Sequence, residues 1–269
     1  MKTLWSLILG SFLICVISSG FFDRAYALNF GTNITVWDNQ GNTNGPGDTI
    51  MNYDGTGIGW EDQETEPDTL QSEDWDLEGI FLNGTILSLV GQWDFINGED
   101  GASSSYDNDN DGKYTSGDIF IDVDSDNNYD YVFDVDWTNK SYTFYGISTG
   151  VYINASYKSP DSDPWKIDTT ASTLNNLGTG TLVAGVDNSL GFIGSSYHNY
   201  VTGFDLMPIF NDLGVSELDF KTHFTMECGN DEIEGQGTAP VPEPATLILL
   251  GTGLIGIAGL SRKRIKKSA

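Results

Sequence analysis

The chain has almost no cysteine from which to build a covalent framework. Its two cysteines are Cys15 and Cys228, and Cys15 lies in an apolar N-terminal run. Ile14 stands before Cys15, where a lipoprotein signal places a small residue, so lipidation is not expected. Removal of the leader leaves Cys228 alone, which excludes an internal disulfide in an exported domain. The domain must therefore be held by its apolar core, with or without bound metal.

That N-terminal run belongs to a segment with the three parts of a secretory signal. Lys2 precedes apolar residues 4–17, and Ala25-Tyr26-Ala27 offers a small-x-small cleavage site. We therefore expect residues 1–27 to be a signal peptide and the mature chain to begin at Leu28.

Positive charge is scarce outside the C-terminal end. The chain has 12 Lys and Arg residues against 39 Asp and Glu, for a formal net charge of −27. All acidic residues except Asp23 lie between residues 28 and 243, and the only basic residues in that stretch are Lys113, Lys140, Lys158, Lys166 and Lys221. Such a field repels nucleic acid and anionic membrane surfaces and attracts divalent cations. We expect no nucleic-acid partner.

Catalytic signatures are scarce as well. His198 and His223 are the only histidines, and neither lies near a G-x-S-x-G nucleophile motif. The sequence shows no zinc-type ligand spacing, Gly-rich phosphate loop or cysteine nucleophile. His223 sits in a strand-like run beside Phe224, where a single histidine is most often a packed structural residue. We expect a non-catalytic protein. A secreted glycan-active enzyme is a less favoured alternative, because glycosidases act with a pair of carboxylates and this chain has so many that no single pair is informative.

The chain does contain many short strand-like runs separated by Gly, Asn and Asp. The strongest hairpin signal is Asn83-Gly84 within residues 80–96. Further strands are predicted within residues 141–157, 181–186, 190–193, 197–206 and 218–227. In the last of these, Phe220, Thr222, Phe224 and Met226 are predicted to lie on one side. Residues 206–213 are predicted to form a short helix or a turn at Pro208. No helices alternate with the strands, which predicts an all-β fold, an antiparallel β-sandwich or jelly-roll-like domain over residues 28–238.

An Asp-rich stretch over residues 107–136 concentrates the candidate chemistry. Its first part has carboxylates at the first, third, fifth and twelfth positions and a glycine, Gly112, at the sixth, the spacing of a calcium loop. The predicted ligands are Asp107, Asp109, Asp111, the Lys113 carbonyl, Thr115 and Asp118. An Asp at the twelfth place predicts weak affinity, about 10⁻⁴ to 10⁻³ M. The loop resembles those of dockerin-type and thrombospondin-type calcium repeats; the alternative is a turn that needs no metal.

A second predicted calcium loop follows at once. Its candidate ligands are Asp122, Asp124, Asp126 and Asp130. The loop joins two runs in which apolar residues alternate with polar ones. If residues 126–128 form the connection, the apolar residues of both runs lie on one face of the hairpin. That register places Asp124 opposite Asp130 and Asp122 opposite Val132. A cation would relieve the repulsion between opposed carboxylates; the alternative is a solvated acidic face.

Several tryptophans bear on a second functional class. They are Trp60, Trp75, Trp93, Trp137 and Trp165. Burial is the commoner state of such rings, and we favour it for Trp60 and Trp75 in their acidic run. If the tryptophans are exposed, they offer a platform for stacking sugars. A carbohydrate-binding adhesin is therefore the alternative function.

The C-terminal residues 239–269 combine three unlike elements in order. Pro242-Glu243-Pro244 precedes a Gly-rich apolar run over residues 245–260, and Arg262-Lys263-Arg264 follows it. The apolar run is short of the roughly 20 residues of a spanning helix, and the basic end is expected to stay cytoplasmic. The arrangement is similar to the PEP-CTERM sorting signal. This resemblance implies processing by exosortase, transient residence in the inner membrane, and release to the surface or surroundings of a Gram-negative bacterium.

The body also resembles a group of exosortase-dependent surface proteins that have no assigned activity. The similar segments are residues 90–95, 117–124, 129–131 and 223–231. We therefore expect a calcium-stabilised protein of the cell surface or extracellular matrix. Exopolysaccharide or other matrix components are its expected partners, and it contacts the membrane through its C-terminal segment.

Overall fold

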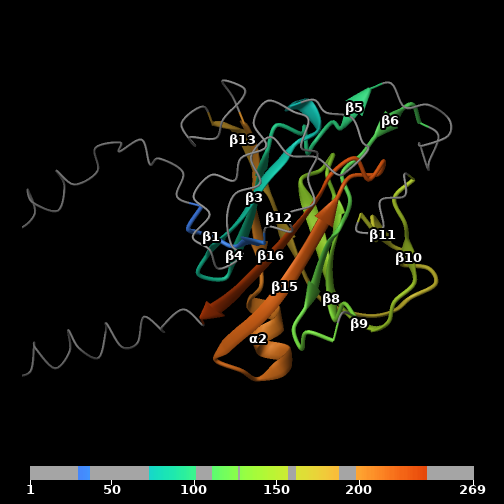
Figure 1. Cartoon of the computed structure of the whole chain (residues 1–269). Helices are drawn as coiled ribbons and strands as arrows, with labels where there is room; N and C mark the ends of the chain where they lie inside the picture. Colours follow the sequence, from blue (N-terminus) through green and yellow to red (C-terminus); the bar gives the residue numbers. More distant parts are fainter. Residues whose placement is uncertain are drawn as a thin grey trace, which may run out of the picture.

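The computed structural model describes residues 30–36, 73–100, 111–126, 128–156, 162–187 and 198–240. Within these residues the strands form two large antiparallel sheets that pack as a sandwich (Figure 1). The five-stranded sheet contains, in spatial order, β1 (Thr32–Asn33), β3 (Leu77–Asn83), β4 (Ile86–Gly91), β14 (His198–Asp205) and β13 (Val183–Asp187). The prediction of an all-β, sandwich-like domain is confirmed.

The second large sheet carries the candidate chemistry. It contains seven strands, in the order β12 (Thr173–Thr181), β9 (Ser141–Thr149), β8 (Tyr131–Asp136), β7 (Ile119–Asp122), β15 (Glu217–Thr225), β16 (Glu232–Pro240) and β2 (Thr35–Val36). The smaller elements are the pairs β5 (Glu99–Asp100) with β6 (Lys113–Tyr114) and β10 (Tyr152–Ile153) with β11 (Lys166–Ile167), the 3₁₀ helix η1 (Glu73–Trp75) and the helix α2 (Met207–Leu213).

The main core lies between the two large sheets, and alternation along the strands fills it. On β15 the predicted apolar side is confirmed, because Phe220, Phe224 and the following Met226 are buried in this core. On β8 the alternate residues Phe133 and Val135 are buried in the same core. Burial of such large side chains contributes about 1.5–3 kcal/mol each. The apolar core between the two sheets is thus the principal source of stability.

The two sides of the sandwich are each closed by a chain segment that changes sheets at one buried apolar residue. Ile34, 4% exposed, separates β1 from β2, and Leu182, 6% exposed, separates β12 from β13. The backbone at these corners stays hydrogen-bonded: Ile34 N–H donates to the Ile80 carbonyl, and Leu182 N–H donates to the Lys140 carbonyl. Exposed strand edges invite pairing with other chains. Tying the edge strands together at these corners limits that hazard.

Two local predictions are confirmed. Asn83 pairs with Ile86 across a two-residue turn, and Gly84 there has a φ of 63°, a conformation that suits glycine. The helix α2 has Pro208 in its first turn, where the missing N–H costs nothing.

The predicted register of β7 against β8 is wrong by two residues. Ile119 pairs with Phe133 and Ile121 with Tyr131. The paired strands therefore end before the predicted connection of residues 126–128 begins. The cause is the Asp122 side chain, whose Oδ1 accepts the N–H groups of Asp124 at 3.1 Å and Ser125 at 2.7 Å and so starts the turn at once. A shift of two residues leaves every side chain on its predicted face.

The outer face of the seven-stranded sheet has a smaller apolar cluster of its own. Phe120 from β7, Val132 from β8 and Ile167 from β11 are buried together there. The β10–β11 pair therefore covers part of this outer face. Polar side chains that share the face are partly shielded from water, which strengthens their interactions.

The last strand extends beyond the predicted domain end at residue 238. β16 continues to Pro240, and Ala239 is fully buried in the main core. Within the described residues no helix has the length and apolar character needed to cross a membrane. The predicted signal peptide over residues 1–27 and the apolar run over residues 245–260 lie outside the described residues.

Candidate metal centres on the outer sheet face

The first Asp-rich loop is described only from Asp111 onward, so Asp107 and Asp109 lie outside the described residues. Asp111 is exposed, and its Oδ1 accepts the Lys113 N–H at 2.8 Å. The Lys113 ammonium forms an ion pair with Asp100 at 2.7 Å. These are the contacts of a polar turn, and calcium binding by this loop stays a prediction.

Two further predicted ligands of that loop, Thr115 and Asp118, have partners elsewhere. The Asp118 carboxylate is 1% exposed, and its two oxygens accept the N–H groups of Val135 and Ile167, each at 3.0 Å. The pKa of Asp118 is raised to about 7, because the effect of burial outweighs that of the two N–H groups, which lower it. Thr115 donates from N and Oγ1 to Glu227 Oε2, both at 3.2 Å. Asp118 therefore links β8 to β11, and Thr115 links the loop to the end of β15.

The second Asp-rich loop does bring carboxylates together. Asp122, Asp124 and Asp130 each place a carboxylate oxygen within 4.8 Å of the others. Asp122 is buried at the end of β7, Asp130 is half-buried just before β8, and Asp124 is exposed between them. Asp126 is not in this group, and its two oxygens accept the N–H and the side-chain amide of Asn128. We call the three clustered residues the Asp triad.

Hydrogen bonds hold the Asp triad in place, and its charges oppose one another. Asp122 is fixed by the turn described above, and Asp130 Oδ2 accepts the Val123 N–H at 2.9 Å. Burial raises the pKa of Asp130; the Val123 N–H lowers it, and the charges of Asp124 and Asp122 raise it further. A proton or a cation at this position is therefore favoured. Three hard oxygen donors suit calcium better than zinc.

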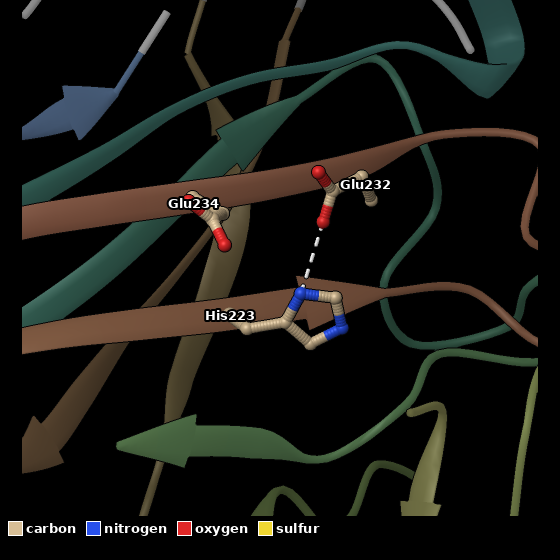
Figure 2. Close-up of side chains that lie close together, drawn as sticks. All are labelled: His223, Glu232 and Glu234. Atoms are coloured by element: carbon tan, nitrogen blue, oxygen red, sulfur yellow. Dashed lines mark ion pairs between the residues drawn. The ribbon is translucent and has the colours of Figure 1, made fainter. Parts of the chain in front are cut away.

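A second cluster lies on the same face, where β15 pairs with β16. His223 Nδ1 is 2.9 Å from Glu232 Oε2, and Glu234 places an oxygen within 4.8 Å of both (Figure 2). His223 and Glu232 are buried, and Glu234 is exposed. His223 Nε2 lies 3.1 Å from the Pro164 carbonyl oxygen. We call His223, Glu232 and Glu234 the His–Glu cluster.

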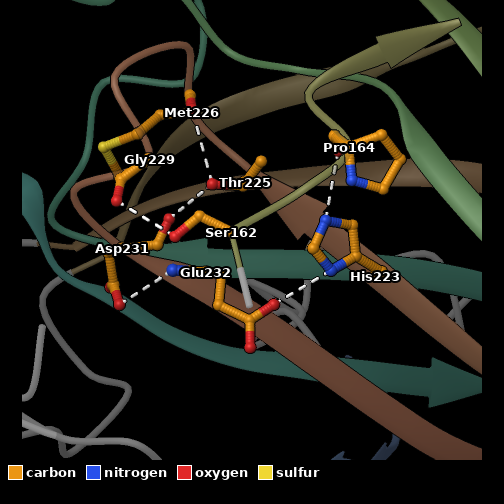
Figure 3. A network of polar contacts seen from close by, with 8 residues as sticks. All are labelled: Ser162, Pro164, His223, Thr225, Met226, Gly229, Asp231 and Glu232. Carbon is orange, nitrogen blue, oxygen red and sulfur yellow. Dashed lines mark hydrogen bonds and ion pairs between the residues drawn. The ribbon is translucent and has the colours of Figure 1, made fainter. Parts of the chain in front are cut away.

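A network of polar contacts positions the backbone behind this cluster (Figure 3). Asp231 Oδ1 accepts the Glu232 N–H at 3.0 Å, and its Oδ2 accepts the Leu77 N–H at 2.6 Å. Thr225 Oγ1 donates to the Asp231 carbonyl at 2.7 Å, and Ser162 donates to the Gly229 carbonyl at 3.0 Å. The turn between β15 and β16 is thus tied to the other sheet and to the segment before β11.

Tyr129 lies close to both clusters. Its ring centroid is 6.0 Å from that of His223. Burial raises the pKa of Tyr129, and so do the charges of Glu234, Glu232 and Asp122. The two clusters therefore share one negative region on the outer face of the sheet.

The other histidine provides a contrast in the five-stranded sheet. His198 Nε2 lies 3.1 Å from Glu78 Oε1, and both side chains are fully buried. Among the described residues this pair is not part of a group of three potential metal ligands. His223 is equally buried, as expected of a packed structural residue, and differs from His198 in belonging to a group of three potential ligands.

The His–Glu cluster has no zinc-type ligand spacing along the chain, so a spacing motif does not reveal it. Its members lie on two neighbouring strands, and His223 pairs directly with Glu234 across the ladder. One signal was available: if residues 228–231 form a hairpin turn, alternation places His223, Glu232 and Glu234 on the same polar face.

Three of the tryptophans are buried and do not offer the sugar-stacking platform considered for an adhesin. Trp93, Trp137 and Trp165 are 0%, 7% and 3% exposed. Trp93 Nε1 donates to Ser116 Oγ at 2.8 Å. Trp75 is half-buried and packs on Trp93 with ring centroids 5.4 Å apart, which supports the core interpretation. Trp60 lies outside the described residues.

A polar groove is open beside Trp137. It has a volume of about 750 Å³, and its lining includes Asp134, Thr143, Lys166, Thr179 and Thr181, with Trp137 as an apolar wall. Hydroxyl and carboxylate groups in a groove are the kind of donors and acceptors that bind sugar hydroxyls.

Comparison with known proteins identifies the C-terminal residues. Residues 240–264 match the PEP-CTERM protein-sorting motif, which confirms the resemblance drawn from the sequence. The motif implies export, processing by exosortase and membrane-associated sorting to the cell surface. The motif residues Pro242, Glu243, Pro244, Arg262, Lys263 and Arg264 lie outside the described residues. No curated protein and no solved structure matches the chain significantly.

Proposed function

We propose that this exosortase-sorted chain is a non-catalytic component of the cell surface or extracellular matrix of a Gram-negative bacterium, and that bound calcium stabilises it. The observation that carries the proposal is the convergence of the Asp triad on the outer face of the sheet. An exported protein with a formal net charge of −27 has many carboxylates to accommodate, and divalent cations are attracted to such a field.

The chemistry of the Asp triad favours calcium. Calcium takes six to eight oxygen ligands at about 2.3–2.6 Å in flexible geometry. Three carboxylates supply part of this set, and water has access on the side of the exposed Asp124. A site with few protein ligands is weak, so we expect a dissociation constant of about 10⁻⁴ to 10⁻³ M, the range of extracellular modules.

An incompletely coordinated calcium ion also suits a role in a matrix. Coordination positions not filled by the Asp triad are available to oxygen atoms of a partner. Hydroxyl-rich or anionic exopolysaccharide carries such oxygens, and is the partner class that we propose.

A melting experiment on the full-length chain in detergent tests the calcium proposal. Calcium that binds only the folded state adds stability by mass action, about 2.7 kcal/mol at a hundredfold excess over the dissociation constant. Millimolar calcium should therefore raise the melting temperature of the metal-stripped chain. No shift at any calcium concentration would contradict the proposal.

Two matched variants locate the effect. Asp124→Asn removes one triad charge and keeps the shape of the loop, and should weaken calcium binding about tenfold, because ligand charge tunes affinity. Asp126→Asn changes a carboxylate two residues away that lies outside the triad. It should retain the calcium response. Equal effects of the two variants would indicate diffuse charge screening instead of a site.

A carbohydrate-binding adhesin is the second candidate, and the polar groove favours it. A glycan array with the full-length chain tests this function. Binding that is lost in Lys166→Gln, whose side chain lines the groove, would support it. Binding that is unchanged in this variant would place any sugar site elsewhere.

A further inference from the structure

The two ring nitrogens of His223 have different surroundings, and the difference fixes the tautomer. Nε2 faces the Pro164 carbonyl oxygen at 3.1 Å. A carbonyl oxygen only accepts hydrogen bonds, so Nε2 carries a proton and donates it. Nδ1 faces Glu232 Oε2 at 2.9 Å. When Nδ1 and the carboxylate are both deprotonated their lone pairs repel, so a proton or a metal ion must lie between them.

We propose that Nδ1 of His223 and the carboxylates of Glu232 and Glu234 bind a divalent transition metal ion, with Zn²⁺ as the expected occupant. Metal-binding histidines almost always donate the other ring N–H to a carboxylate, carbonyl or water, which sets the tautomer and the ring orientation. Pro164 supplies such a carbonyl here. His223 is thus held in the tautomer that a metal at Nδ1 requires.

The distances fit a zinc site after a small adjustment. Zinc–nitrogen and zinc–oxygen bonds are about 2.0–2.1 Å, so ligands in a tetrahedral site lie about 3.3 Å apart. The Nδ1–Oε2 distance of 2.9 Å has to open by a few tenths of an ångström. The Glu234 oxygen is already within 4.8 Å of the others, and its exposed side chain can move closer. Water reaches the fourth position from the side of Glu234.

The charges balance when zinc replaces the proton. With one proton shared between His223 and Glu232, the cluster carries a net charge of −1, because two carboxylates face one imidazolium. Zinc displaces that proton to solvent and brings two positive charges, so the loaded site is neutral. Partial burial makes this neutralisation more favourable than it would be in water. Binding should release about one proton per zinc ion near neutral pH.

The donor atoms separate this site from the Asp triad. An imidazole nitrogen suits zinc and other transition metals, whereas an all-oxygen set suits calcium. The loaded site would join β15 and β16 and, through Pro164, the segment that leads into β11. It shares no ligand with the Asp triad, so either site can be removed without taking a ligand from the other.

Zinc titration of the full-length, metal-stripped chain in detergent tests this proposal. Isothermal titration calorimetry in two buffers of different ionisation enthalpy should give one zinc site, with a buffer-dependent heat that corresponds to about one released proton. Nitrogen-15 imidazole resonances provide a second readout, because His198 and His223 are the only histidines. Zinc should shift the Nδ1 resonance of His223 and leave His198 unchanged.

A pair of exposed glutamates provides the variant and its control. Glu234→Gln removes a predicted ligand from an exposed position and should weaken zinc binding tenfold or more without loss of folding. Glu217→Gln alters an exposed glutamate at the other end of the same strand pair, and should bind zinc like the unmodified chain. Zinc that shifts neither histidine, or that binds Glu234→Gln as tightly as the unmodified chain, would overturn the assignment. Calcium binding at the Asp triad should be unchanged in both variants, so the two proposals fail separately.

Discussion

The two faces of the seven-stranded sheet are built from the same strands but have opposite characters. On the inner face, alternate residues such as Phe133, Phe144 and Phe224 are fully buried against the other sheet. On the outer face, the same sheet presents Asp122 from β7 and His223 from β15, which belong to the candidate metal clusters. The inner face holds the fold together by apolar burial. The outer face collects charged side chains, so we expect its stability to depend on ions and pH.

The largest predicted effect tests the inner face. Phe133→Ala opens a cavity where the ring packs on Phe144, with centroids 4.3 Å apart, and on Phe204. The free energy of unfolding should fall by about 3–5 kcal/mol. Urea denaturation of the full-length chain in detergent measures this loss, which should be the same with and without calcium. A loss that calcium restores would mean that the two faces are not independent.

The next effect concerns Asp118, a polar group with a structural role. Asp118→Asn replaces an acceptor oxygen by an amide, so the Val135 or Ile167 N–H loses its partner, at a cost of about 1–3 kcal/mol. At high pH this cost is offset in part, because the ionised carboxylate of the unmodified chain is itself destabilised by burial.

The pH dependence of that variant has a definite sign. The pKa of Asp118 is raised from 3.8 to about 7 in the folded chain, so the folded state binds this proton more tightly than the unfolded state. The contribution of Asp118 is therefore most favourable below about pH 4 and falls as the pH rises toward 7, by up to about 1.4 kcal/mol per pH unit. We expect the free energy of unfolding, measured with urea in the presence of EDTA, to decrease between pH 5 and pH 8. This decrease should be smaller for Asp118→Asn than for the unmodified chain. Parallel decreases would mean that Asp118 is ionised throughout.

A smaller effect is expected in the first Asp-rich loop. If this loop binds calcium, Asp109→Ala combined with Asp111→Ala should remove part of the calcium-induced rise in melting temperature, on the order of 1 kcal/mol of stabilisation for weak binding. Asp124→Asn in the Asp triad provides the comparison. A calcium response that survives in the double variant and is lost in Asp124→Asn would assign all binding to the outer sheet face.

The smallest effect is predicted at the surface. The ion pair of Lys113 with Asp100 is exposed, and water and salt screen such surface pairs so well that they contribute little to stability. Lys113→Gln should therefore change the urea midpoint by less than any variant above. A larger change would show that the Lys113 side chain does more than pair at the surface.

Local patterns in the sequence predicted much of this architecture. Alternation in residues 218–227 identified the inner face of β15, and Asn83-Gly84 identified a hairpin, because side-chain direction and turn geometry are properties of a few consecutive residues. The same local reasoning placed the Asp triad on one loop. It missed the register of that loop by two residues, since the hydrogen bonds of the Asp122 side chain decide where the strands part.

The sequence by itself determined the sorting motif, the all-β class and the alternation that separates an apolar face from a polar one. Only the tertiary structure decided that Trp93, Trp137 and Trp165 are buried and that the two histidines have different surroundings. The physical reason is that alternation tells which side of a strand a residue faces, but packing decides which strands become neighbours. His223 meets Glu232 within the β15–β16 hairpin, whereas it meets Pro164, which is 59 residues away in the chain, only because the segment before β11 packs against β15.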